Sequence, residues 1–331
     1  MEFVPTTEVA TGRPSGIGSP GDDLVGENLV GADLRGRDLS GVDLRGRDLS
    51  SADLAGTRLI GAQLDGAVLH GTNLAGAQLT GASMSGADLS QVNAQQAGLG
   101  GVDLTGAMMV GADLSGATLS GADATGADLR GANLDDARLR ETVLAGADLT
   151  RVSAKRADLS EAVVNGAAFV DTDLSGARLR KVSGFESANW IGVDILDVDF
   201  SGAYTARRSI IDQNYLHEFR NRDRKHRLLY ELWRLTSGCG QSVARWGGLT
   251  ALVTIVFAIA YTQVEIDYGD HETPLSPLYF SVVALTTLGF GDVLPASMPA
   301  QIVVIAEVTV GYCMLSGLLS IFATRMGRRA D

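Results

Sequence analysis

One short stretch of the chain combines residue types that can bind a bare cation through backbone oxygens. It runs from Thr286 to Asp292 and reads T-T-L-G-F-G-D, with two glycines at alternate positions. Regular β structure points successive carbonyl oxygens to opposite sides, whereas glycine accepts a positive φ that lets the backbone turn them to one side. We therefore expect Gly289 and Gly291 to have positive φ. A row of carbonyl oxygens on one side can replace the water shell of a monovalent cation.

Two apolar segments flank this stretch, and each is long enough to cross a bilayer as a helix. Residues 246–264 carry no charge, and residues 299–324 carry only Glu307. At 1.5 Å per residue, each helix covers a hydrocarbon core of ~30 Å. Between them, Ser276 and Pro277 predict a capped helix start, and residues 277–287 predict a helix too short to span. Non-helical backbone at this depth is tolerated only if protein buries it or it lines a wet path.

Residues 240–331 resemble the two-transmembrane bacterial potassium channels, whose filter T-V-G-Y-G-D is similar to T-L-G-F-G-D here. The resemblance implies an all-α, two-transmembrane pore domain at 245–331 with a filter at 287–291. It implies that K+ is the permeant ligand and that no other cofactor is needed. The residues to which the resemblance assigns the K+ sites are Thr287, Leu288, Gly289 and Phe290. Those assigned to the outer mouth are Gly291 and Asp292, with Thr286 at the pore-helix end.

The resemblance also implies an assembly and a gate. Each chain has one filter stretch, and four stretches are needed to surround an ion. We therefore expect a homotetramer. Gly311 lies where related channels have a hinge glycine, and Gly317 is the alternative; close helix packing would also explain either glycine. Glu307 is costly in lipid, so it faces protein or the cavity. Two roles stay open for it, a hydrogen bond to the pore-helix end or attraction of cations below the filter.

Two features of the filter region depart from the related channels: one is Phe290, and the other is Tyr279 and Phe280, which occupy positions where tryptophans are common. Phe290 stands where they usually have tyrosine, and it lacks the hydroxyl that ties the filter to its surroundings. A weakly selective cation channel is therefore an alternative to a potassium-selective one.

The charge pattern around the apolar segments predicts their orientation. Basic residues gather in residues 207–245 and again at Arg325, Arg328 and Arg329, whereas residues 265–298 contain acidic residues and no Lys or Arg. The positive-inside rule then places both termini in the cytoplasm, in a cell inner membrane. Residues 204–244 predict a basic amphipathic linker helix that contacts anionic lipid, with a solvated connector helix as the alternative.

The first part of the chain repeats every five residues. From Leu24 to Leu179 every fifth residue is apolar, and 25 of these 32 positions are leucine. A period of five forms no stripe on an α-helix and would turn alternate leucines outward on a flat strand. The pattern fits a chain that turns a corner once per pentad, with the recurrent glycine two residues after the leucine at the corner. Four corners then close a coil of about twenty residues.

This repeat resembles the pentapeptide-repeat family, whose A-(D/N)-L pattern appears at Ala32-Asp33-Leu34 and Ala112-Asp113-Leu114. The resemblance implies a right-handed quadrilateral β-helix over residues 22–203. Large residues after a one-residue phase slip predict a plugged C-terminal end; they are Phe185, Trp190, Ile195 and Phe200. Arg37 and Arg47 depart from the pattern, because they occupy inward positions that small residues fill elsewhere.

Composition excludes several functions. The net charge is −12, and residues 1–206 carry 28 acidic against 15 basic groups, so we expect no nucleic-acid partner. Cys239 and Cys313 form neither a disulfide framework nor a zinc site. No catalytic constellation stands out, so the chain is not expected to be an enzyme. Residues 1–21 lack the pattern of a signal peptide and predict a flexible tail.

Together these observations favour a homotetrameric potassium channel of the inner membrane with a cytoplasmic β-helix. The β-helix is then a regulatory module or binds a cytoplasmic protein partner. The alternative from another class is a membrane-anchored scaffold for protein interactions. Acidic pentapeptide-repeat proteins include DNA mimics, but that role needs a free soluble rod, and we do not expect it here.

Overall fold

The computed structural model describes residues 24, 26–239, 242–269, 272–289, 291 and 293–330, without the side chains of 323–330. The predicted tail at 1–21 and the filter residues Phe290 and Asp292 lie outside the described residues. The chain divides into two compact units, Met1–Asn214 and Tyr215–Asp331.

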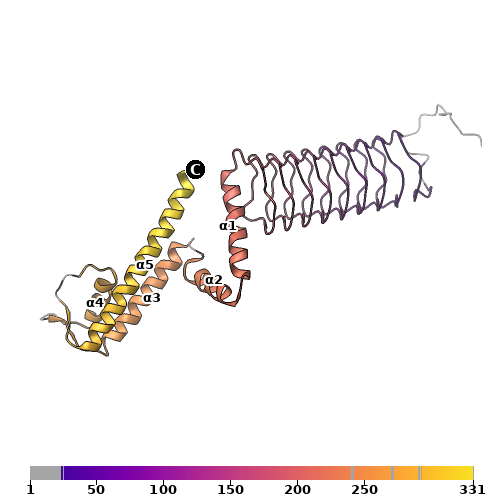
Figure 1. Ribbon diagram of the computed structural model, residues 1–331. Coiled ribbons are helices and arrows are strands. Elements are labelled where there is room, and N and C mark those ends of the chain that lie inside the picture. Colours follow the sequence, from indigo (N-terminus) through magenta and orange to yellow (C-terminus); the bar gives the residue numbers. More distant parts are fainter. Residues whose placement is uncertain are drawn as a thin grey trace, which may run out of the picture. The chain divides into compact units, whose positions relative to one another are not determined.

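The first unit is a stack of coils formed by the five-residue repeat (Figure 1). Parallel bridges join residues twenty apart, from Asp33↔Asp53 to Val163↔Ser183. Backbone hydrogen bonds join neighbouring coils in both directions, from the N–H of Leu34 to the carbonyl of Asp53 at 2.8 Å and from the N–H of Asp53 to the carbonyl of Ala32 at 2.9 Å. The predicted twenty-residue coil and the β-helix are confirmed.

The corners lie two residues after each apolar centre, as predicted, and their φ is positive. Most are glycines, such as Gly61 at φ +63°. Ser51, Asp136 and Arg151 take the same conformation at φ +58°, +60° and +59°. A side chain in this region costs ~1–2 kcal/mol. The coil therefore imposes the corner even where glycine is missing.

The core of this unit contains the leucines and the small residues two positions before them. Leu39, Leu54 and Ala62 are fully buried. Four buried threonines fill small-residue positions, and each hydroxyl donates to the carbonyl 23 residues earlier, as from Thr57 to Leu34 at 2.9 Å. Arg47 follows the same rule: its Nη2 donates to the carbonyls of Glu27 at 2.5 Å and Leu24 at 3.3 Å. The guanidinium thus completes the hydrogen bonds of the first coil.

The C-terminal end of the stack is plugged, as predicted. The phase slip appears as bridges between residues twenty-one apart, such as Ala168↔Asn189. Trp190 is fully buried, its ring stacks on Phe169 with centroids 4.2 Å apart, and its Nε1 donates to the carbonyl of Phe185 at 3.0 Å.

Helix α1 (Tyr204–Asn221) begins by covering this end (Figure 1). Ile210 is buried against the last coil. The side chain of Gln213 accepts from the N–H of Trp190 at 2.6 Å, and that of Asn214 accepts from the N–H of Gly192 at 2.7 Å. These two amides replace the hydrogen bonds that a further coil would make, so the sheet edge is closed.

The predicted single linker helix is in fact two. Helix α1 ends at Asn221, and α2 (Arg224–Ser237) starts at Asp223, whose carboxylate caps the N–H of His226 at 2.8 Å. Gly238 at φ +59° ends α2. Phe219 of α1 packs its ring on His226 and Trp233 of α2.

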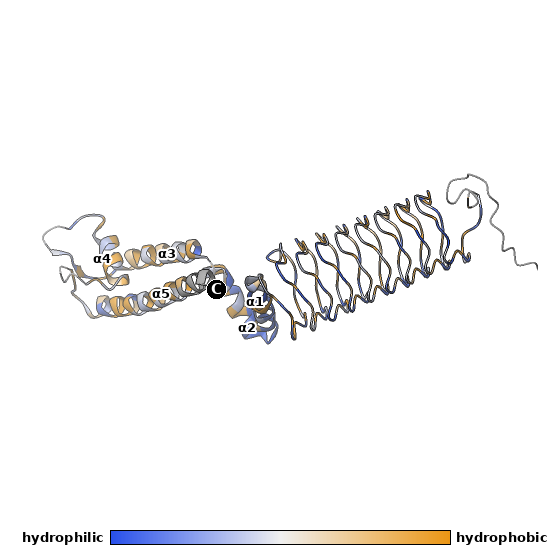
Figure 2. Cartoon of the chain, turned by 90° about the horizontal axis from the view of Figure 1, so that it is seen from above, coloured by the Kyte–Doolittle hydropathy of each residue, from blue (hydrophilic) through white to orange (hydrophobic). Residues whose placement is uncertain are grey.

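The second unit contains the two predicted membrane helices and the short helix between them. They are α3 (Val243–Tyr261), α4 (Ser276–Leu285) and α5 (Met298–Ala330). The predicted ranges were 246–264, 277–287 and 299–324, so α3 and α4 end earlier and α5 runs further. Figure 2 shows that α3 and α5 are apolar over much of their length, and both are long and apolar enough to cross a membrane. Strands β1 (Ile266–Asp267) and β2 (Leu294–Pro295) pair antiparallel in the connecting segments.

Candidate functional site

Helix α4 is held between α3 and α5 by an apolar face. Phe280, Val283, Ala284 and Leu285 are buried, and the Phe280 ring lies 4.9 Å from that of Tyr261 on α3. Pro277 is in the first turn, as predicted. Ser276 does not cap the helix as predicted, because its hydroxyl accepts from the N–H of Thr273 at 2.8 Å and so fixes the preceding turn.

In the segment after α4, every second residue from Thr287 to Gly291 has a positive φ. Thr286 closes the helix, with its hydroxyl donating to the carbonyl of Val282 at 2.6 Å. Thr287, Gly289 and Gly291 then have φ of +57°, +47° and +79°. The prediction for the two glycines is confirmed, whereas Thr287 was not predicted. Left-handed conformation in a β-branched residue is an outlier, and such strain gathers at functional sites.

Residues 286–289 are exposed in the single chain. Leu288 is 62% exposed, an unusual state for a leucine beside a buried helix. This segment is thus available to contacts outside the chain. Phe290 of the predicted filter and Asp292 of the predicted outer mouth lie outside the described residues.

Glu307 is fully buried and joins three helices. Its carboxyl group on α5 makes hydrogen bonds with the Tyr261 hydroxyl on α3 and with the Ser281 hydroxyl on α4. Of the two roles left open, the structure contains the contact with the pore helix. The contact lies in the middle of α4 rather than at its end.

Both candidate hinge glycines lie at close approaches between helices. A Cβ at Gly311 would lie 2.3 Å from the carbonyl oxygen of Leu285, and one at Gly317 would lie 2.3 Å from Cζ2 of Trp246. The indole of Trp246 also donates to the carbonyl of Met314 at 3.0 Å. Helix α5 runs unbroken through both positions. Each glycine thus has a packing role, and the hinge stays a prediction.

Sequence reasoning missed Tyr261, Ser281 and Trp246 as parts of this site. The available signal was their polarity within apolar segments, because a polar group in lipid needs a partner. Their sequence separation from Glu307 and Met314 hid which partner each one has.

The aspartates that precede the leucines of the repeat stabilise their own corners. Asp33 accepts from the N–H of Arg35 at 3.2 Å and from its Nε at 2.9 Å. The hydrogen bond from the Arg35 side chain lowers the pKa of Asp33 to about 2. On the same face, the Asn73 amide donates to Asp53 at 2.9 Å, and Asn93 donates to Asn73 at 3.2 Å. These local hydrogen bonds explain the row of Asp and Asn side chains on this face without a ligand.

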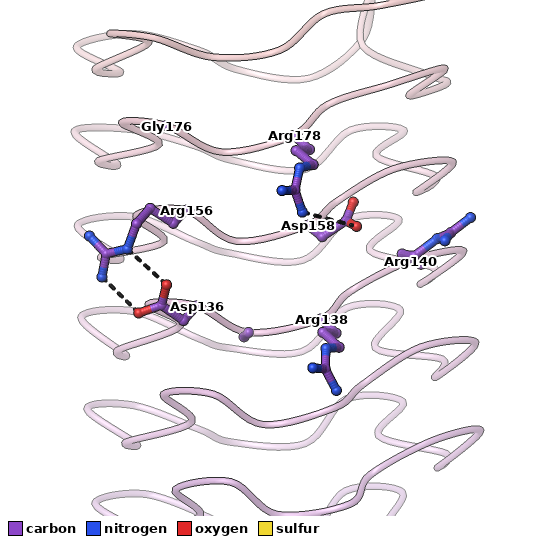
Figure 3. A pocket seen from close by; sticks show the side chains of 8 residues that line it. Asp136, Arg138, Arg140, Arg156, Asp158, Gly176 and Arg178 are labelled. Carbon is purple, nitrogen blue, oxygen red and sulfur yellow. Dashed lines mark hydrogen bonds and ion pairs between the residues drawn. The ribbon is translucent and has the colours of Figure 1, made fainter.

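A shallow hollow of about 520 Å³ lies on the side of the coil stack (Figure 3). Arg156 binds the carboxylate of Asp136 in the coil before it through Nε at 2.8 Å and Nη2 at 2.7 Å. Arg178 makes a looser ion pair with the coil before it, with its Nη1 3.8 Å from Oδ2 of Asp158. Solvent screens exposed pairs of this kind, so they contribute little to stability. Most of the residues that line the hollow are arginines and aspartates, so it is a charged surface between coils.

Two models of known families match the chain, one in each of its two units. The model of pentapeptide repeats matches eight copies, and that of an ion channel matches residues 249–328. The repeat matches cover residues 28–62, 48–86, 82–121, 97–136, 119–153 and 155–183. The chain therefore contains pentapeptide repeats followed by an ion channel domain. No curated protein matches it.

Solved structures similar to the chain are pentapeptide-repeat proteins. HetL from the cyanobacterium Nostoc sp. strain PCC 7120, involved in heterocyst differentiation regulation, is 29% identical, with 54% of this chain and 90% of HetL covered and a TM-score of 0.35. A trypsin-treated variant of QnrB1, a plasmid-mediated fluoroquinolone resistance protein, is 20% identical, with 56% and 95% covered and a TM-score of 0.39. A protein of the Arabidopsis thaliana thylakoid lumen is 34% identical, with 33% and 72% covered and a TM-score of 0.19.

Proposed function

We propose that the ion channel domain of this chain conducts potassium selectively as a homotetramer. The carbonyl oxygens of Thr287, Leu288, Gly289 and Phe290 bind the dehydrated ion. The observation that carries the proposal is the alternation of left-handed residues at Thr287, Gly289 and Gly291, directly after a short helix held between two apolar helices. Such alternation turns successive carbonyl oxygens toward one side, as an ion path needs.

The fourfold assembly follows from the number of filter segments. One chain supplies one exposed segment at 286–289, which surrounds no ion by itself. Four copies around an axis bring together rings of carbonyl oxygens and cover the exposed Leu288. Gly291 and Asp292 then form the outer mouth.

The charge pattern supports an inner-membrane location with both termini in the cytoplasm. Helix α2 presents exposed leucines together with arginines; Leu228 and Leu235 are 73% and 74% exposed. We propose that this face contacts anionic lipid, because apolar residues beside basic ones are typical of interfacial helices.

Flux through liposomes tests the channel. We expect purified protein to carry K+ and to exclude Na+, with a bi-ionic reversal potential far from zero. A reversal potential near zero identifies the weakly selective cation channel, and no flux at all favours the membrane-anchored scaffold.

Gly289→Ala tests the filter itself. Alanine at φ +47° costs ~1–2 kcal/mol per chain, so we expect potassium flux to fall about tenfold or more. Gly247→Ala on α3 is the matched control, because nothing lies within 4 Å of the added Cβ. Equal flux in the two variants contradicts the assignment of the filter.

A further inference from the structure

Glu307 is the one acidic residue that is fully buried in the part of the chain that the structure describes. It lies on α5, and the two groups that contact its carboxyl come from α3 and α4. No Lys or Arg occurs between Trp246 and Thr324. Among the described residues, an ionised carboxylate at this position would therefore be buried without a positive partner, which is strongly unfavourable in an apolar environment.

Each hydrogen bond around Glu307 needs one proton, and the partners show which group supplies it. The Ser281 hydroxyl lies 2.8 Å from the backbone carbonyl oxygen of Thr254 on α3 and is also bonded to Oε1 of Glu307. The Tyr261 hydroxyl is bonded to Oε2. A carbonyl oxygen carries no proton, so the single proton of Ser281 belongs to the bond with Thr254. The bond between Ser281 and Glu307 then needs a proton from the carboxyl group.

We propose that Glu307 is held as a neutral carboxylic acid whose proton is donated to the Ser281 hydroxyl oxygen. The Ser281 hydroxyl in turn donates its own proton to the backbone carbonyl of Thr254. The Tyr261 hydroxyl donates to the other carboxyl oxygen. Three hydroxyl protons then satisfy three hydrogen bonds, and no charge is buried. The chain of bonds ties α3, α4 and α5 together at a single point.

The other groups around this point agree with a neutral acid. Besides Tyr261, α3 contributes the backbone carbonyl of Thr254, and α4 contributes Ser281 and Phe280, whose ring packs on that of Tyr261. A further ionisable side chain in this region is Tyr268, whose ring packs on that of Phe280 with centroids 6.4 Å apart. None of these groups is a cation.

The neutral acid is a positioning residue for conduction, and this part of the inference rests on the proposed channel function. Ser281 lies on α4 five residues before Thr286, where the filter segment begins. Fixing Ser281 fixes the helix that carries this segment. Glu307 does not touch the ion path; it acts through α4.

Infrared difference spectroscopy tests the protonation state without relying on conduction. We expect the wild-type spectrum at neutral pH, minus that of Glu307→Gln, to show one protonated-carboxyl band. Ser281→Ala should shift this band, because it removes the acceptor of the carboxyl proton. A carboxylate band in place of the acid band overturns the proposal, and so does a band that Ser281→Ala leaves unmoved. These bands report the protonation state of Glu307 even if the protein does not conduct potassium.

Potassium flux tests the positioning role. Glutamine can donate to Ser281 and accept from Tyr261, so Glu307→Gln should keep flux within about twofold of wild type. Glu307→Ala and Glu307→Asp, which lose or shorten the link, should lower flux at least tenfold. A Glu307→Gln protein that assembles but does not conduct overturns the neutral-acid role, and full flux in Glu307→Ala overturns the positioning role.

Discussion

Single residues in both units adopt a left-handed backbone, and their surroundings differ. In the repeat, Ser51 and Arg151 take this conformation at corners where the hydrogen bonds to neighbouring coils fix the backbone. Thr287 takes it in a short segment beyond the end of α4. Among the described residues, the strain at Thr287 is therefore balanced by the contacts that hold α4.

Gly311→Ala should disturb the contact between α4 and α5. The new Cβ would lie 2.3 Å from the carbonyl oxygen of Leu285, so one helix must move at a cost of ~1–3 kcal/mol. We expect a lower melting temperature and a changed open probability in single-channel recordings. Gly248→Ala is the control, since the added Cβ has open space. If both proteins behave as wild type, Gly311 has neither a packing nor a hinge role.

At the scale of elements, each end of the coil stack is completed by side chains rather than by another coil. Arg47 bonds to carbonyls of the first coil, and Gln213 and Asn214 of α1 bond to the last. Helix α1 therefore belongs structurally to the repeat over its first half. This explains why the predicted linker is divided.

Trp190→Ala should open the C-terminal end of the stack. Loss of the buried ring and of its stacking on Phe169 should lower the free energy of unfolding by ~3–5 kcal/mol, as measured by denaturant titration of the Met1–Asn214 fragment. Tyr204→Ala, at a position 65% exposed, should change it by less than about 1 kcal/mol. Similar losses in the two variants would show that the plug is not at Trp190.

The coil stack should lose stability in acid. Hydrogen bonds from Arg35, from Arg45 and from Ser201 lower the pKa of Asp33, Asp43 and Asp199 to about 2. Because the pKa is lower in the folded state, the stabilisation is complete above the unfolded value of about 4 and is lost as the pH falls toward about 2.

Thermal unfolding of the Met1–Asn214 fragment followed by circular dichroism checks this dependence. The melting temperature should fall over that range and stay level above it. In a variant with asparagine at all three positions, the fall should be smaller. A melting temperature that rises in acid contradicts the role of these carboxylates.

At the scale of the whole molecule, the channel domain and the repeat are separate compact units, joined within α1. We expect the repeat to regulate conduction or to bind a protein partner. Deletion of residues 1–222 separates these roles from the pore, because it removes α1 together with the stack that α1 caps and leaves α2 intact.

The shortened protein should still carry potassium in liposomes, with an open probability changed several-fold if the repeat regulates the gate. Unchanged open probability makes the repeat an accessory for partner binding. Loss of tetramers on deletion would instead show that the repeat is needed for assembly.

The sequence determined the features whose cause is local. A leucine every five residues with glycine two positions later admits only a chain that turns at each pentad, and the coils follow it closely. The two apolar segments and the alternate glycines likewise predicted α3, α5 and the φ of Gly289 and Gly291.

Only the tertiary structure decided the partners of residues that are far apart in the chain. Glu307 meets Tyr261 across 46 residues and Ser281 across 26, and Trp246 meets Met314 across 68. Periodicity shows that a residue is buried but not what it is buried against. That depends on how helices pack, because a buried polar group takes whichever donor or acceptor the neighbouring helices bring within reach.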